Sequence, residues 1–491
     1  MKTNIKINKQ QTIQFFERIT AMKTTRNFFV SAMTLILIAL VAGNISAQGI
    51  LKNGGVIRNT GTATYKEVQN YKGASNGTIS NSGTLNTTIA GGGSGNFLNT
   101  DGAARTGTVR NYIGGIGNGT IVVATNFNNN FAGSTISNDI VAGLSTIKVA
   151  GALTNAGTFS TTNGRVIYNG AAQNILATAY GTLVTDVGNT KTLLATTTVN
   201  DSLRVDGGST LAVSTFQLNL NGAINIAQDG GIFTANAGIV DYHGDRNQSM
   251  IAAQYKTLTL SGATAARTKT SPGALSFVAT GSLTVDSFDT LSVSSGNLDM
   301  SVVGTTLANS GAIKVAGDAS FNTSITQAGT FYYNGAIAQA VGAVQYANLI
   351  LGNVGGKTFP NGGTVSITGS YTINGGAGIR TYTNNTFQLA GTSGNQPLTN
   401  LAESFNILQF TGAATKSLAG TAFSANRMDL LATTGVVTNN VTTLTLANVA
   451  NVSLIIASGT ELDNSLTMTM NMNGDLQNDG ILVNNGTIGV Y

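Results

Sequence analysis

Residues 168–193 read YNGAAQNILATAYGTLVTDVGNTKTL, and parts of this stretch return in the same order further along the chain. The first element is Tyr-x-Gly at the end of an apolar run. The second is an aromatic residue, a leucine three residues on, and then a lysine followed by Thr or Ser. Self-similarity in a long chain predicts a repeat architecture, in which each unit buries its apolar face against its neighbours. The first element occurs as Tyr168-Asn169-Gly170, Tyr242-His243-Gly244 and Tyr333-Asn334-Gly335, and the second as Tyr180, Leu183, Lys191; Tyr255, Leu258, Lys269; Tyr346, Leu349, Lys357; and Phe405, Leu408, Lys416.

The repeat units vary in length. Successive aromatic residues of the second element lie 75, 91 and 59 residues apart, while the spacing from aromatic residue to lysine is 11 in three of the four copies. A third element aligns residues 202–214 with residues 282–294 without a gap. Units of unequal length built from matching parts indicate bundles of short turns, with turns gained or lost between copies.

A shorter repeat, G-x-[IL]-x-N-x-G, occurs near both ends of the chain. Each copy reads as a short apolar strand that leads into a turn. We expect its Asn and Gly to take left-handed backbone conformations, which these residues reach at little steric cost. The copies are residues 55–61, 77–83, 151–157 and 474–480, with a looser one at residues 307–311.

Within the units, apolar residues such as Val365 and Ile367 alternate with Thr and Ser. This period of two predicts half-buried strands, and we find no helical period after the leader. Proline cannot donate a backbone hydrogen bond to a neighbouring strand, and the chain has only three prolines in 491 residues. The hydrogen-bond ladders of parallel strands would therefore be left unbroken. We therefore predict an all-β fold, an elongated right-handed parallel β-helix (β-solenoid) behind an N-terminal signal peptide. A transmembrane barrel would need aromatic girdles, and a propeller an even period of about 40–50 residues.

The N-terminal segment has the order of a secretory signal peptide. Lys23 and Arg26 precede an uncharged apolar run, residues 28–42, and small residues follow as far as Ala47. This order predicts export with cleavage after Ala47, and Met22 as a candidate true start; the alternative is an uncleaved anchor. The expected organisation is a leader at 1–47, Gly/Asn/Thr-rich turns at 48–163, long repeat units at 164–441 and terminal turns at 442–491.

The composition excludes several classes of protein. The leader holds six of the 25 basic residues and one of the 20 acidic ones, so the remaining chain has 19 of each. Without a basic stripe we expect no nucleic-acid partner. The chain has no Cys, which excludes thiolate metal sites, cysteine nucleophiles and disulfides. No second apolar segment of spanning length follows the leader, so we expect no transmembrane span in the mature chain.

At the family level, the short G-x-[IL]-x-N-x-G turns resemble the solenoids of filamentous haemagglutinin and autotransporter passengers. The unit from Tyr168 to Leu193 resembles the β-strand repeats of large exported surface proteins of Gram-negative bacteria. The resemblance covers about residues 50–491 and implies adhesion or cell-surface structure. Such proteins usually end in a sorting or anchoring domain, whereas this sequence stops at Tyr491 within turn-like residues. We therefore expect a truncated chain or an anchor elsewhere.

The lone histidine, His243, lies in the polar run Asp241-Tyr242-His243-Gly244-Asp245-Arg246. An acid, a histidine and an arginine together could form an acid–base or metal site. However, His243 takes the place of Asn169 and Asn334 in the repeat, so we interpret it as a turn residue.

The acids and lysines of the repeats are interpreted in the same way. Asp286 and Asp289 are the best local acid pair, but Asp206 recurs in the Asp286 position and Ser209 replaces Asp289. We expect the repeat lysines to solvate strand ends and discourage lateral pairing; the alternative is a weak basic ladder for acidic glycans. Turns with Asp475 and Asp479 lack the nonapeptide pattern of calcium-binding solenoids. We therefore expect no catalytic, cofactor-binding or metal-binding residues and no cofactor.

The sequence thus predicts a non-enzymatic, adhesin-like structural protein at the cell surface, in the outer membrane or outside the cell. Its expected partners are surface glycans or other cells, bound through repeated polar turns. Two alternatives remain. One is a polysaccharide-active β-helix enzyme, a lyase or hydrolase, which would need a groove lined by non-repeating acids. The other is an ice-binding solenoid, which would need Thr-x-Thr arrays in strict register, whereas examples such as Thr268 and Thr270 look scattered.

Overall fold

The computed structural model describes residues 45–46, 50–53, 56–72, 75–76, 78–81, 84–87, 96–99, 108–111, 119–129, 132–138, 145–222, 227–322, 325–374, 378–399, 403–431, 435–447, 452–465 and 469–491. The predicted signal peptide lies outside these residues, apart from Ile45–Ser46 (β1) near the end of the leader. This short strand pairs in parallel with Ala63 and Thr64. Cleavage after Ala47 would therefore remove β1.

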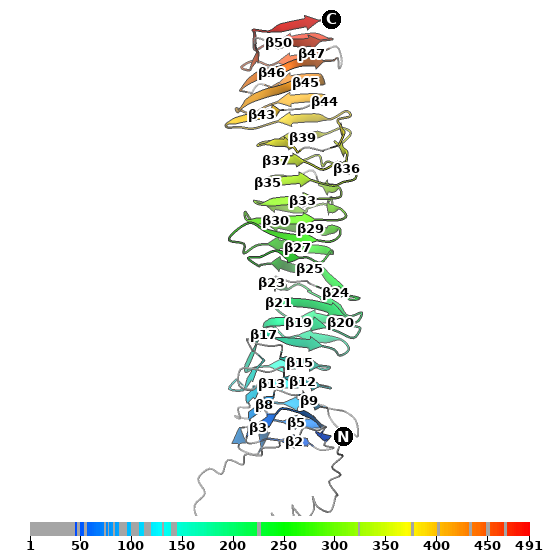
Figure 1. Cartoon of the computed structure of the whole chain (residues 1–491), viewed down its shortest axis with the longest axis vertical. Coiled ribbons are helices and arrows are strands. Elements are labelled where there is room, and N and C mark those ends of the chain that lie inside the picture. Colours follow the sequence, from blue (N-terminus) through cyan, green and yellow to red (C-terminus); the bar gives the residue numbers. More distant parts are fainter. Residues whose placement is uncertain are drawn as a thin grey trace, which may run out of the picture. The chain divides into compact units, whose positions relative to one another are not determined.

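The described residues form strands and no helix. The strands pair in parallel, apart from the hairpin of Tyr71–Lys72 (β6) and Ser75–Asn76 (β7) and one antiparallel bridge between Asp206 and Gly230. About 18 turns stack on one another along one axis, as Figure 1 shows for the coloured part of the chain. The prediction of an all-β, parallel β-solenoid is confirmed.

The described strands form two large sheets and three small ones. The 23-stranded sheet contains β1 (Ile45–Ser46), β3 (Val56–Asn59), β4 (Thr62–Tyr65), β8 (Thr78–Asn81), β9 (Thr84–Thr87), β11 (Thr108–Arg110), β12 (Thr120–Val123), β14 (Thr135–Ser137), β15 (Thr146–Val149), β17 (Thr158–Tyr168), β18 (Gln173–Ile175), β19 (Ala179–Thr185), β20 (Thr190–Leu193), β21 (Thr197–Asp206), β22 (Thr210–Ala212), β23 (Gln217–Leu220), β24 (Ala227–Asp229), β25 (Ile232–Tyr242), β27 (Gln254–Leu260), β29 (Leu275–Val285), β31 (Leu298–Met300), β32 (Thr306–Asn309) and β34 (Ala319–Phe321).

The remaining strands belong to the second large sheet and to the small sheets. The 19-stranded sheet contains β26 (Gln248–Ser249), β28 (Arg267–Ser271), β30 (Asp289–Val293), β33 (Ala312–Val315), β35 (Thr326–Tyr333), β37 (Gln345–Leu351), β39 (Thr364–Ile367), β40 (Tyr371–Ile373), β42 (Thr386–Leu389), β43 (Asn395–Thr399), β44 (Ser404–Phe410), β45 (Thr415–Leu430), β46 (Val436–Leu446), β47 (Val452–Ile456), β48 (Glu461–Asn464), β49 (Thr469–Met472), β50 (Asp475–Asn478), β51 (Ile481–Asn484) and β52 (Thr487–Val490). The small sheets contain β2 (Ile50–Lys52), β5 (Glu67–Gln69), β10 (Phe97–Leu98), β13 (Phe127–Asn129) and β16 (Leu153–Asn155); β36 (Gln339–Ala340), β38 (Lys357–Thr358) and β41 (Arg380–Thr381); and the β6–β7 hairpin.

Each turn of the N-terminal part contributes three short strands. The turn of β2, β3 and β4 is followed by that of β5, β8 and β9, and each strand pairs with its equivalent one turn on. Because successive side chains of a strand point to opposite faces, the columns alternate between inside and outside. Ile79, Val109 and Ile136 stack in a fully buried column, and Thr78 and Thr108 stand beside it on the outer face. This confirms the predicted period of two.

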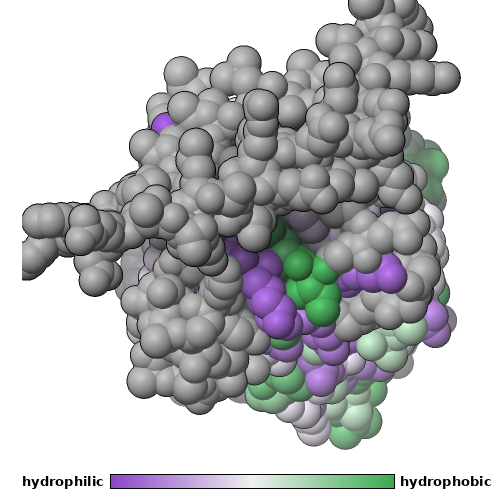
Figure 2. Space-filling view, turned by 90° about the horizontal axis from the view of Figure 1, so that it is seen from below, coloured by the Kyte–Doolittle hydropathy of each residue, from purple (hydrophilic) through white to green (hydrophobic). Residues whose placement is uncertain are grey.

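From β17 onward, single long strands serve two faces of the solenoid. The first residues of β17 pair with β14 and its last residues with β15, and the register of β17 against β19 shifts between Thr161 and Arg165. The same shift occurs where β25 and β29 pair with β27. Such irregularities bend a strand locally, so one strand turns the corner that two strands share in the earlier turns. Seen from below in Figure 2, the described surface carries hydrophilic and hydrophobic residues in small neighbouring groups.

Neither the asparagines nor the described glycines of the short repeat take left-handed conformations, so that expectation was wrong. Among the described residues, every non-glycine residue with a positive φ lies outside the copies of the short repeat. Asn81 instead faces the interior and is fully buried. Its Nδ2 donates to Oδ1 of Asn111, one turn on (2.9 Å), and to the carbonyl oxygen of Thr120 (3.0 Å). An inward-facing amide side chain can hydrogen-bond both to another asparagine side chain and to a backbone carbonyl at the bend between two strands. An asparagine in a surface turn could not reach both groups.

These amides form ladders that run from turn to turn. Every step is an Nδ2–Oδ1 hydrogen bond of 2.6–2.9 Å, and most donors also reach a backbone carbonyl that begins a neighbouring strand. The ladders are Asn53, Asn70, Asn99, Asn129 and Asn155; Asn59, Asn81, Asn111 and Asn138; and, towards the C-terminus, Asn439, Asn464 and Asn484.

Candidate functional site

The two aromatic positions of the long repeat meet inside the solenoid. Tyr168 ends β17 and Tyr180 lies in β19, and their hydroxyl oxygens are 2.9 Å apart. Equivalent pairs join Tyr242 to Tyr255 (3.3 Å) and Tyr333 to Tyr346 (2.9 Å). All these rings are fully buried. The recurring Tyr-x-Gly and aromatic elements are therefore the two halves of one buried contact.

The glycine of Tyr-x-Gly stands where two turns approach each other closely. A β-carbon at Gly170 would lie 1.6 Å from the carbonyl oxygen of Ala150, so no other residue fits there without a shift of the backbone. The N–H of Gly170 donates to Oε1 of Gln173 (2.7 Å). Gln173 Nε2 in turn donates to the carbonyl oxygens of Val149 and Gly151 in the preceding turn. This glutamine thus satisfies three backbone groups at one corner.

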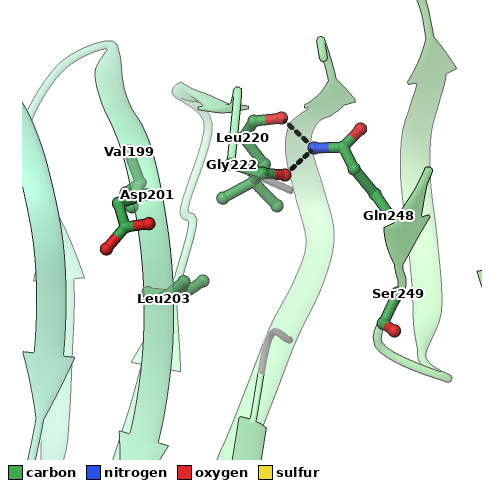
Figure 3. Close-up of a pocket in the computed structure, with 7 residues that line it drawn as sticks. All are labelled: Val199, Asp201, Leu203, Leu220, Gly222, Gln248 and Ser249. Atoms are coloured by element: carbon green, nitrogen blue, oxygen red, sulfur yellow. Dashed lines mark hydrogen bonds between the residues drawn. The ribbon is translucent and has the colours of Figure 1, made fainter. Parts of the chain in front are cut away.

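The same glutamine recurs in each long unit. Figure 3 shows Gln248, at the start of β26, pointing at the carbonyl oxygens of Leu220 and Gly222, to which its Nε2 donates at 2.7 and 2.6 Å. The cavity beside it measures about 10 Å³, close to the smallest space that holds one water molecule. The corner is therefore a packed structural element, with no room for a substrate. The other copies are Gln339 and Gln396.

The repeat lysines are buried, so the expectation that they solvate strand ends was wrong. Each lysine pairs with the glutamine one turn back, as Lys191 does with Gln173, and its side chain reaches the glycine of the same corner. Lys416 Nζ donates to the carbonyl oxygens of Gly412, Ala414 and Gly391 at 2.8, 2.8 and 3.2 Å. An ammonium has three donors and satisfies several corner carbonyls at once, which offsets part of the cost of burying its charge. The four lysines, Lys191, Lys269, Lys357 and Lys416, are 0–1% exposed.

Burial disfavours the charged form of these lysines. It lowers the pKa of Lys416 to about 8. It also lowers the pKa of Lys191 and Lys357. Because these ammonium groups face inward, the alternative of a basic ladder for acidic glycans is also wrong for them.

His243 occupies the same corner position as Asn169 and Asn334, as predicted from the repeat. The backbone N–H of each donates to the carbonyl oxygen that ends the equivalent strand of the preceding turn. The His243 side chain is 53% exposed; its Nδ1 lies 2.7 Å from Ser261 Oγ and 3.5 Å from Asp241 Oδ2. Both contacts use the same nitrogen, whereas a Ser-His-Asp triad uses the two different ones. The cluster therefore lacks the geometry of an activated nucleophile.

The two members of the predicted acid pair differ in exposure, since Asp286 is exposed and Asp289 is buried. Asp289 is 1% exposed and lies 3.5 Å from the Nζ atom of Lys269, while Asp206, which aligns with Asp286, contacts Arg204 at 2.9 Å. Asp475 and Asp479 are exposed. Within the described ranges, His, Asp and Glu form no group of three that could hold a metal ion.

A shallow polar recess of about 360 Å³ opens on the outside of the C-terminal half. Its lining comes from three successive turns around β41, β44 and β45. Arg380 forms an ion pair with Glu403 (2.5 Å), and the buried rings of Tyr382 and Phe405 contact each other in a tilted arrangement, with centroids 4.6 Å apart. The lining residues are Arg380, Thr381, Tyr382, Thr383, Asn384, Ser404, Phe405, Asn406 and Asn426.

Amide side chains line this recess one turn apart. Asn426 Nδ2 donates to Asn406 Oδ1 (3.0 Å), and Asn384 Nδ2 donates to Asn361 Oδ1 (3.2 Å). Asn406 and Asn426 are separated by 20 residues, which is the signal by which the sequence could have indicated this pair of amides. Nothing in the sequence indicated the Arg380–Glu403 pair, since neither residue recurs in the repeat.

In the described parts of the chain, no helix has the length and apolarity that crossing a membrane requires. Comparisons with protein-family models, with curated proteins and with solved structures found no match to this chain.

Proposed function

We propose that the chain is an exported, adhesin-like structural protein of the cell surface that binds glycans through outward polar side chains. The observation that carries the proposal is the recess lined by Asn384, Asn406 and Asn426. Amide groups both donate and accept hydrogen bonds, as sugar hydroxyls do, and the three amides belong to successive turns. Parallel strands repeat about every 4.8 Å, so one extended polymer could contact several turns at once.

Two features favour binding over hydrolysis. A glycosidase uses two carboxyl groups that flank the scissile bond. The lining of the recess contains no acid, and the nearby Glu403 is 4% exposed and paired with Arg380. An ice-binding surface is also less well supported, because the column of Thr268 and Thr290 continues with Ala312.

Export is tested by locating the protein in its native host. We expect a protease added to intact cells to degrade the protein. N-terminal sequencing of envelope or secreted material should begin near Gln48. A cytosolic product with an uncut N-terminus would contradict the proposal.

Glycan binding is tested with the purified chain on immobilised polysaccharides. Asn406→Ala should weaken binding by roughly fivefold, since a lost hydrogen bond costs about 1 kcal/mol. The control is Asn128→Ala, which removes an outward amide far along the chain and should leave binding unchanged. Release of reducing sugar, inhibition of ice growth, or equal binding by both variants would each argue against the proposal.

A further inference from the structure

One of the repeat lysines faces a buried acid. Lys269 in β28 and Asp289 in β30 belong to adjacent turns, and their side chains are both 0% exposed. Lys269 pairs with Leu291, so Asp289 is its diagonal neighbour, two residues earlier on the partner strand. The Nζ atom lies 3.5 Å from Oδ1 of Asp289. Lysine and acid are thus held side by side without water access.

The hydrogen bonds around Lys269 leave one direction of its nitrogen for Asp289. Nζ donates to the carbonyl oxygens of Gly244 and of Arg246, the latter at 3.1 Å. Neither carboxylate oxygen of Asp289 accepts a hydrogen bond of normal length from the described residues. A neutral amine at this position would keep its two hydrogens on the two carbonyls. Its lone pair would then point towards the carboxyl group.

Burial shifts the pKa of each group in the direction of its neutral form. Burial raises the pKa of Asp289, and the charges of Asp286 and Asp241 raise it further, against the lowering effect of Lys269. Burial is also the largest influence on Lys269 and lowers its pKa, although Asp289, Asp241 and Asp245 oppose this. An amine with a free lone pair beside an un-ionised carboxyl group is the pair of species that an amide-forming reaction requires.

We propose that Lys269 and Asp289 condense to an isopeptide bond that joins two adjacent turns of the solenoid. The Lys269 nitrogen attacks Cγ of Asp289, and the C–N bond forms as the bond from Cγ to the hydroxyl oxygen breaks. One proton of the amine passes to the departing hydroxyl, which leaves as water. The reaction changes no oxidation state and needs no co-reactant. In a chain without Cys it would provide the covalent cross-link between turns that a disulfide cannot.

The chain contains its own comparison site. Lys191 occupies the position of Lys269 in another unit, but the residue that aligns with Asp289 there is Ser209. Ser209 is buried and its hydroxyl lies 2.9 Å from that of Thr185. A lysine corner of this type therefore folds with serine in place of the acid, so Asp289→Ser is a conservative control variant.

Mass spectrometry of the purified wild-type chain tests the proposal directly. The intact mass should be lower by one water than the mass calculated from its own termini. Trypsin cuts after Lys and Arg, so an unlinked chain releases residues 270–314. A linked chain should instead yield residues 268–314 as one peptide that is uncut after Lys269 and lacks one water. Asp289→Ser should restore the full mass and cleavage after Lys269.

Two results would overturn the proposal. One is a wild-type chain of full mass with normal cleavage after Lys269. The other is a loss of water with normal cleavage after Lys269, which would identify a cyclic imide of an Asp residue. Neither result depends on the folding of a variant, because both are read from the wild-type protein.

Discussion

The hydroxyl oxygens of Tyr168 and Tyr180 lie 2.9 Å apart in the interior of the solenoid. The N–H of Leu176 donates to Tyr168, and Tyr180 donates to the carbonyl oxygen of Leu176. Both phenols are therefore satisfied without solvent. Burial raises the pKa of Tyr168 to about 12, and that of Tyr180 well above its ordinary value.

These tyrosine pairs make the fold sensitive to alkali. In the unfolded chain tyrosine ionises near its ordinary pKa of 10.0, whereas buried Tyr168 keeps its proton up to about pH 12. The stability that the pair contributes is thus present below pH 10 and is lost as the pH rises through 12. We expect circular dichroism to show unfolding over this range, together with tyrosinate absorbance. The double variant Tyr168→Phe, Tyr180→Phe should show a shallower loss, and an equal loss in the variant and the wild type would contradict the prediction.

Removal of a buried lysine should destabilise its corner. Lys416→Met leaves the carbonyl oxygens of Gly391, Gly412 and Ala414 without their donor, and we expect a loss of about 1–3 kcal/mol in chemical denaturation. Lys256→Met is the control, because the half-buried Lys256 makes its hydrogen bonds to carbonyls at the solvent-exposed surface. Equal effects of the two substitutions would contradict this prediction.

The lysine also gives a pH dependence of the opposite sign to that of the tyrosines. The pKa of Lys416 is about 8 in the folded chain against 10.5 when unfolded, so between these values the unfolded chain binds more protons. Stability should therefore rise from pH 8 towards 10.5 through this residue, and Lys416→Met should reduce that rise. Denaturation curves of both proteins at several pH values measure the difference.

The asparagine ladder can be tested with two neighbouring residues of β13. Asn129 is fully buried and links Asn99 to Asn155, whereas Asn128 points outward. We expect Asn129→Ala to cost about 1–3 kcal/mol, because it leaves buried amide and carbonyl groups unpaired. Asn128→Ala should stay within about 0.5 kcal/mol of the wild type. Thermal and chemical denaturation of both variants measure the two effects. Equal stability of the two variants would show that the ladder does not stabilise the fold.

A whole unit should be removable in register. Tyr255 and Tyr346 stand at the same position of β27 and β37, which have the same pattern of burial. Deleting residues 255–345 joins Gln254 to Tyr346 and should leave a folded, shorter solenoid, since stacked turns contact mainly their neighbours. Deleting residues 255–346 instead slips the strand by one residue and should destabilise it, because inward side chains then point outward. Small-angle scattering and circular dichroism measure the shape and the fold of both variants. Unfolding of the variant with the in-register deletion would contradict the repeat interpretation.

His243 should be dispensable for stability. Its side chain is largely exposed, and the equivalent residues of the other units are asparagines. His243→Asn should therefore change the free energy of unfolding by no more than about 0.5 kcal/mol. A larger loss, or a lost binding activity, would mean that the contact with Ser261 has a role beyond the turn.

The sequence by itself determined the strands, their alternation and their stacking into a parallel solenoid. Residues two apart point to the same face of a strand, so the alternation of Val365 and Ile367 with polar residues already fixed which side chains lie inside. The recurrence of Tyr-x-Gly, aromatic residue and lysine likewise located the corners of the long units. These are local patterns, and the backbone geometry of a strand converts them into structure without knowledge of distant residues.

Only the tertiary structure decided where the polar side chains go. Lysine and asparagine are usually exposed, so Lys416 and Asn81 read as surface and turn residues in the sequence. They are buried because the corners of stacked turns leave backbone carbonyl groups inside the solenoid. Leaving such a carbonyl without a hydrogen bond costs more free energy than burying a polar side chain that donates to it. The same stacking places Lys269 against Asp289 and gathers Asn384, Asn406 and Asn426 into one recess. Such contacts depend on which residues lie opposite each other one turn apart. Because the units vary in length, this register cannot be read from the spacing of residues in the sequence.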